Sequence, residues 1–127
     1  MISLDTFARI AREEYERLPQ EFRALTGEIQ IRVADWPTDE ALDELGLEHP
    51  LDLLGLFEGV GLTEGSAFGE TGRLPNRIWL YRRPILAFRE EGDDTLEAVI
   101  RHVLIHEIGH HFGLSDDDMY AIDDAED

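Results

Sequence analysis

The sequence predicts one α+β domain in which helices pack on a small mixed β-sheet. The chain has 127 residues and is 43% hydrophobic, which is ordinary for a single globular domain. Helical and strand-like hydrophobic periodicities interleave without the strict alternation of a parallel α/β fold. No repeat or low-complexity linker divides the chain, so we expect residues 1–127 to form a single domain.

The first part of the chain predicts three helices and one strand. Apolar residues recur at helical spacing after Ser3, a residue that can cap a helix. Alternation of apolar and polar residues indicates a half-buried strand. Gly46 is typical of a helix end. The predicted elements are a helix over 4–18, a short helix from Pro19 to near Gly27, a strand over 29–33 and an acidic helix over 38–45.

The middle of the chain predicts strands around a glycine-rich loop. Residues 51–58 fit either a strand or the end of a loop. Residues 59–75 contain five glycines and are expected to be mostly loop. Residues 77–82 alternate cleanly and predict a strand. Pro84 can open a short helix over 85–90.

Composition and charge exclude several functions. The formal net charge of −18 argues against a nucleic-acid partner, which would need a basic face, and favours cations and basic peptides. Because there is no cysteine, a metal site would use His, Asp or Glu. No apolar run approaches the ~18 residues of a membrane span, and no signal-like segment opens the chain, so we expect a cytoplasmic protein without a membrane partner. All eleven basic residues are arginine, which suggests a GC-rich bacterial genome.

The most informative segment is a helix predicted from Asp94 to Phe112. Asp94 and Glu97 have the spacing of a capping box, and Glu97 and Arg101 can form an ion pair on an exposed stripe. Nearly all other positions are apolar, so the helix should be buried on most sides, under the sheet.

His106, Glu107 and His110 interrupt this apolar helix in an H-E-x-x-H pattern. Buried ionisable groups need a partner, and a metal ion would supply one. Residues four apart lie on one helix face, ~6 Å apart along the axis, so both imidazoles can reach one ion. Glu107 is rotated by ~100° and can approach a water on the metal. The pattern therefore predicts a zinc site with Glu107 as general base.

A third ligand is expected after the helix. Gly113 can turn the chain back, and Asp116 follows three residues later as a hard oxygen ligand. This set leaves a fourth position open for water, as catalytic zinc requires. Asp117 and Asp118 compete for the role, and spacing alone favours Asp116. The acidic residues beyond Asp118 are expected to form a solvated, frayed end.

With these residues, the sequence resembles the short bacterial zincin-like metallopeptidases that have an H-E-x-x-H-x-x-G-x-x-D signature. The likeness runs from about residue 29 to residue 120 and is sharpest over 103–116. It implies a zincin-like α+β core with a small mixed sheet on the buried helix. It also implies Zn²⁺ at His106, His110 and Asp116, with Glu107 as catalytic base.

Four residues near the motif are expected to have structural roles. His102 and His110 are ~12 Å apart along the helix, so His102 is expected to be a core or edge histidine. His111 points away from the motif face and is expected to be a hydrogen-bonded structural residue. Gly109 should permit close packing against a strand, and Met119 fits core packing better than a platform under the metal.

The sequence leaves the rest of the cleft open. Residues 77–82 could be an ordinary strand or an edge strand that pairs with extended substrate. No oxyanion-stabilising residue stands out among the candidates Tyr81, Arg82, Arg83 and Tyr120.

Peptide hydrolysis is the predicted reaction, with a peptide or small protein as substrate. Zinc would polarise the scissile carbonyl, and Glu107 would take a proton from water and pass it to the leaving amine. Only eleven residues follow Asp116, so we do not expect a further subdomain to wall a cleft. The main alternative is therefore a catalytically weak or inactive metal-binding domain that serves as an interaction module. A structural zinc domain with a closed coordination shell is a third hypothesis. The oligomeric state is left open.

Overall fold

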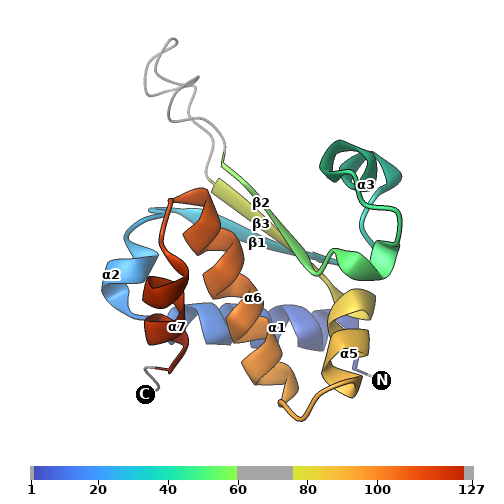
Figure 1. Cartoon of the computed structure of the whole chain (residues 1–127). Coiled ribbons are helices and arrows are strands. Elements are labelled where there is room, and N and C mark those ends of the chain that lie inside the picture. Colours follow the sequence, from blue (N-terminus) through green and yellow to red (C-terminus); the bar gives the residue numbers. More distant parts are fainter. Residues whose placement is uncertain (1, 60–75, 125–127) are drawn as a thin grey trace.

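The computed structural model describes residues 2–59 and 76–124, and it confirms an α+β fold with a mixed sheet (Figure 1). The three described strands are β1 (Ile29–Ala34), β2 (Gly55–Glu58) and β3 (Asn76–Tyr81). β3 lies in the centre, parallel to β1 and antiparallel to β2. Most of the predicted 59–75 loop lies outside the described residues.

The central position of β3 corrects one hypothesis about this strand. It pairs along its length with β1, from Ile29 opposite Asn76 to Ala34 opposite Tyr81, and with β2 on its other side. Because both edges are occupied, residues 77–82 cannot add a substrate strand. For residues 51–58 the strand alternative holds only over the four residues of β2, which follow the 3₁₀ helix η1 (Pro50–Asp52).

Six α-helices are described: α1 (Leu4–Glu16), α2 (Gln20–Arg23), α3 (Asp39–Leu45), α5 (Arg82–Glu90), α6 (Leu96–His111) and α7 (Asp116–Asp124). The predicted cap Ser3 accepts a backbone hydrogen bond, and so does Thr38, which was predicted as the first helical residue but caps α3 instead. Gly46 ends α3 at φ +70°. α2 ends at Arg23 and is therefore shorter than the helix predicted to reach near Gly27. α5 begins directly after β3, two residues before Pro84. No helix in the described ranges is long and apolar enough to cross a membrane.

The alternation of β3 assigns its side chains to two hydrophobic clusters. Ile78 and Leu80 are fully buried with α1 and α6 on one face of the sheet (Figure 1). Trp79 and Tyr81 point to the other face, where α3 contributes Leu42. Because successive side chains of a strand point to opposite faces, one strand supports both clusters. The larger cluster forms the base on which α6 is held.

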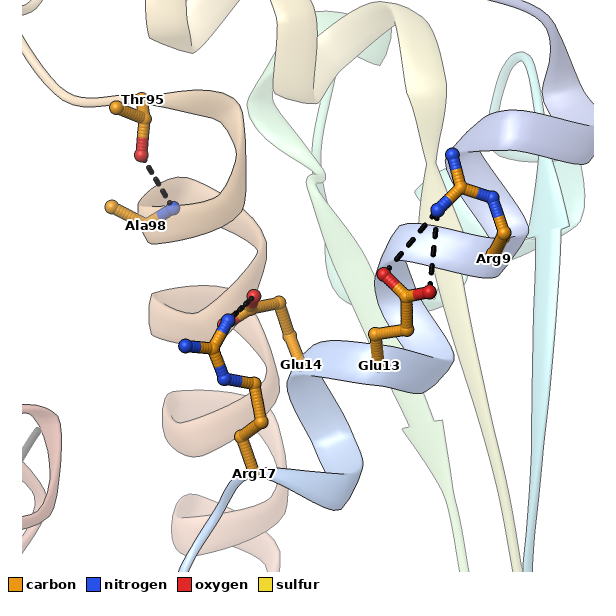
Figure 2. Close-up of polar contacts among 6 residues, drawn as sticks. All are labelled: Arg9, Glu13, Glu14, Arg17, Thr95 and Ala98. Atoms are coloured by element: carbon orange, nitrogen blue, oxygen red, sulfur yellow. Dashed lines mark hydrogen bonds and ion pairs between the residues drawn. The ribbon is translucent and has the colours of Figure 1, made fainter. Parts of the chain in front are cut away.

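The start of α6 differs from the prediction by one residue. Thr95 is the cap, and its hydroxyl accepts a 3.1 Å hydrogen bond from the amide of Ala98 (Figure 2). Asp94 therefore precedes the cap, and the predicted capping box is wrong. Arg101 is also not on an exposed stripe, since its side chain is only 11% exposed and pairs with Asp123.

The chain after α6 folds back as a helix. Gly113 has φ +79°, and the amides of Gly113 and Leu114 donate to the carbonyls of His110 and Gly109, as in a Schellman motif. This confirms the predicted turn. α7 then continues to Asp124, so the expectation of a frayed end beyond Asp118 is wrong for the described residues.

Packing between α6 and α7 explains the helix that replaces the frayed end. Met119 is fully buried, as the core-packing interpretation predicted. A Cβ on Gly109 would lie 2.5 Å from the Met119 sulfur, so this glycine permits contact with α7. The prediction that Gly109 packs against a strand is therefore wrong.

Candidate metal centre

The motif lies on the last turns of α6, beside α7. His106 and Glu107 are partly buried, whereas His110 is exposed. The ring centroids of His106 and His110 are 6.0 Å apart. The Tyr120 ring of α7 lies 5.6 Å from that of His106, so α7 closes one side of the site.

Burial shifts the acidity of Glu107. Desolvation of its carboxylate raises the pKa from 4.5 to about 7. The pKa of Tyr81 is raised to about 12, mainly by burial and then by the negative charges of Glu58 and Glu107. A bound cation beside Glu107 would favour the carboxylate form again.

His106 has the properties of a neutral metal ligand. Its Nε2 is buried and has no hydrogen-bond partner among the described residues. Burial is the largest cause that lowers the pKa of His106, and the positive charge of His102 is the next. His110 also lowers this pKa, whereas the carboxylates of Asp123 and Asp116 raise it. Only the neutral imidazole can coordinate a metal, so this environment prepares the ring for that role.

Asp116 is the first residue of α7 and is exposed. Within residues 2–59 and 76–124, a different group of donors converges: His102, His106 and Asp123 each offer a ligand atom, and these atoms lie within 4.8 Å of one another. His110 and Asp116 are not in this group. The described contacts do not test the predicted ligand set of His106, His110 and Asp116, which stays a prediction. Its donor types and the orphaned His106 nitrogen fit zinc.

The converging group contains residues that sequence reasoning missed. His102 Nδ1 lies 2.8 Å from the Asp123 carboxylate, and the His102 ring lies 4.0 Å from that of His106. His102 was expected to be a core or edge histidine, and Asp123 to lie in a solvated end. The spacing of His102 from His106 was the only available signal. Nothing in the sequence places Asp123, 21 residues later, beside His102.

The residues considered for stabilising an oxyanion have different surroundings in the structure. Arg82 is held by Asp35 at 2.7 Å, which leaves it poorly suited to stabilise an oxyanion. Tyr81 is buried on the α3 face of the sheet. Tyr120 is 53% exposed and faces His106, so it is the best placed of these candidates. His111 packs against Phe57 of β2 with ring centroids 4.4 Å apart, which ties the end of β2 to α6.

Comparisons with known proteins show the family of the chain. The model of a family described as zincin-like metallopeptidase matches residues 26–125. A conserved hypothetical protein from Thermus thermophilus is 25% identical, with a TM-score of 0.57 over 87% of this chain and 94% of the other. No curated protein matches the sequence. Because the family model covers most of the chain, including α6 and its H-E-x-x-H motif, the chain belongs to the zincin-like metallopeptidases.

Proposed function

We propose that the protein is a zinc-dependent peptidase. One observation carries the proposal: on the motif helix of a zincin-like chain, His106 has a buried nitrogen with no hydrogen-bond partner among the described residues, and the partly buried Glu107 follows it directly. An unpaired buried polar atom costs free energy, and a metal ion would compensate for it.

In this proposal His106, His110 and Asp116 hold the ion. When bound, zinc would polarise the scissile carbonyl and make water more acidic. Glu107 accepts a proton from the attacking water and delivers it to the leaving amine. Its position one residue after His106 would place it beside a bound ion without making it a ligand. Tyr120 is the candidate to donate a hydrogen bond to the oxyanion.

The substrate strand would pair with the outer edge of β2. Among described residues β2 pairs only with β3, so its other edge can accept main-chain hydrogen bonds. β2 also lies against α6, since a Cβ on Gly55 would lie 2.8 Å from the Val103 side chain. An extended peptide on this edge would run past the end of α6 that carries the motif. The net charge of −18 favours basic peptides at the encounter step.

The test is Glu107→Gln against a peptide library, with zinc content measured alongside. We expect the variant to bind zinc like the wild type and to lose turnover by about 10²-fold or more. Glu97→Gln is the matched control, because Glu97 is exposed on the same helix. Equal turnover in Glu107→Gln would reject its role as general base.

The main alternative is a metal-binding interaction module without useful turnover. A wild-type protein that binds zinc but cleaves nothing in the library would favour it. In that case Glu107→Gln should leave partner binding unchanged. A cytoplasmic location and a bacterial origin stay predictions from the sequence.

A further inference from the structure

We propose that His102, His106 and Asp123 form a second divalent-cation site that shares His106 with the predicted ligand set. Both sets of ligands include His106, and their second histidines lie on opposite sides of it along α6. His102 lies one turn before His106, and His110 lies one turn after it. α7 supplies the carboxylate in both cases, Asp123 from its last turn and Asp116 from its first.

The distances suit one ion. The three ligand atoms lie within 4.8 Å of one another. Ligands at ~2.0–2.1 Å in a tetrahedral shell lie roughly 3.4 Å apart. His102 Nδ1 and the Asp123 carboxylate oxygen, now at 2.8 Å, would separate slightly to admit the ion, and His106 would move closer. Small side-chain rotations are therefore sufficient, and the helices can keep their positions.

The simpler interpretation is a polar contact between His102 and Asp123 that holds α7 against α6. It accounts for the 2.8 Å contact. It does not account for His106, whose ring lies 4.0 Å from that of His102 while its buried Nε2 lacks a described partner. A cation would use all three groups. His102 is 44% exposed and Asp123 23% exposed, so the group is open to ions from solvent.

Arg101 limits the affinity of the proposed site. Its guanidinium lies 3.7 Å from the second carboxylate oxygen of Asp123 and donates to the carbonyl of Ile122. This charge fixes Asp123 in place but repels a cation. We therefore expect the second site to bind zinc more weakly than the predicted set. Because both sites would use His106, whose buried Nε2 has no hydrogen-bond partner among the described residues, occupation of one site should exclude the other.

The experiment measures binding of Zn²⁺ alone to metal-stripped full-length protein by calorimetry, with Co²⁺ absorption as a second readout. His110→Ala combined with Asp116→Ala removes the predicted set and leaves the proposed one. We expect this variant to bind one ion at least roughly tenfold more weakly than the wild type. Addition of His102→Phe, which keeps a ring beside His106, should abolish binding.

Two results would overturn the second site. One is no binding to the double variant up to high micromolar zinc while circular dichroism shows it folded. The other is binding that His102→Phe leaves unchanged. Asp123→Asn, which preserves size, replaces His102→Phe if the latter unfolds, and the same loss is expected. Failure here is separate from failure of the proposed peptidase, because that test reads turnover after a change at Glu107, which belongs to neither ligand set.

Discussion

α6 and α7 both contribute residues to the candidate metal centre but differ in how they are held. α6 is apolar over most of its surface and has eight buried residues. α7 is acidic, and Met119 is its one buried residue among those described. The first helix is specified by its own composition, whereas the second is a helix because it docks on the first. An acidic segment can thus become part of a site through one buried anchor and a few polar contacts.

The largest expected effects test whether α7 is truly docked. Leu104→Ala in α6 and Met119→Ala in α7 both remove fully buried side chains, so each should lower the free energy of unfolding by about 2–5 kcal/mol. Chemical denaturation measures both. If α7 were only a loosely attached end, Met119→Ala would have almost no effect, and the contrast between the helices would need revision.

A second prediction uses the burial of Glu107 in metal-free protein. Its raised pKa means that the folded state favours the protonated carboxyl of Glu107. The stability that this protonated group contributes is therefore fully present below about pH 4.5 and is lost as the pH rises through about 7. Glu107→Gln removes the cost of ionisation and should stabilise the protein near pH 8 by on the order of 3 kcal/mol.

The matched measurement is denaturation of both proteins in chelator at about pH 4.5 and pH 8. The stabilising effect should nearly vanish at the lower pH. An equal effect at both values would show that the carboxylate is not desolvated.

The contact between the helices can be tested at Gly109. An alanine there gains about 1 kcal/mol of helix propensity but brings a Cβ to 2.5 Å from the Met119 sulfur. Because Met119 is fully buried, we expect a net loss of about 1–2 kcal/mol in the free energy of unfolding. Met119→Ala in the Gly109→Ala background should recover part of the loss. Strict additivity in this double-mutant cycle would contradict the contact.

The smallest expected effect tests which residue caps the start of α6. Thr95→Ala should cost about 1 kcal/mol because it removes the hydroxyl that caps Ala98. Asp94→Ala should change the free energy of unfolding by less than about 0.5 kcal/mol. Thermal denaturation of the two variants compares the caps directly. The opposite ranking would restore Asp94 as the cap.

Local patterns in the sequence determined much of this protein. The H-E-x-x-H spacing, the apolar helix around it, the turn at Gly113 and the cap at Ser3 depend on residues close together in the chain, so short-range physics specifies them. The class of fold and the family follow from the same patterns.

Only the tertiary structure decided which distant groups meet. Periodicity cannot show that β3 lies between two strands, because sheet order depends on long-range pairing. Nor can it bring Asp123 beside His102, because an acidic segment has little reason of its own to fold. Burial of Met119 against Gly109 supplies that reason. The docking of α7 thereby places the carboxylate of Asp123 beside His102 and His106.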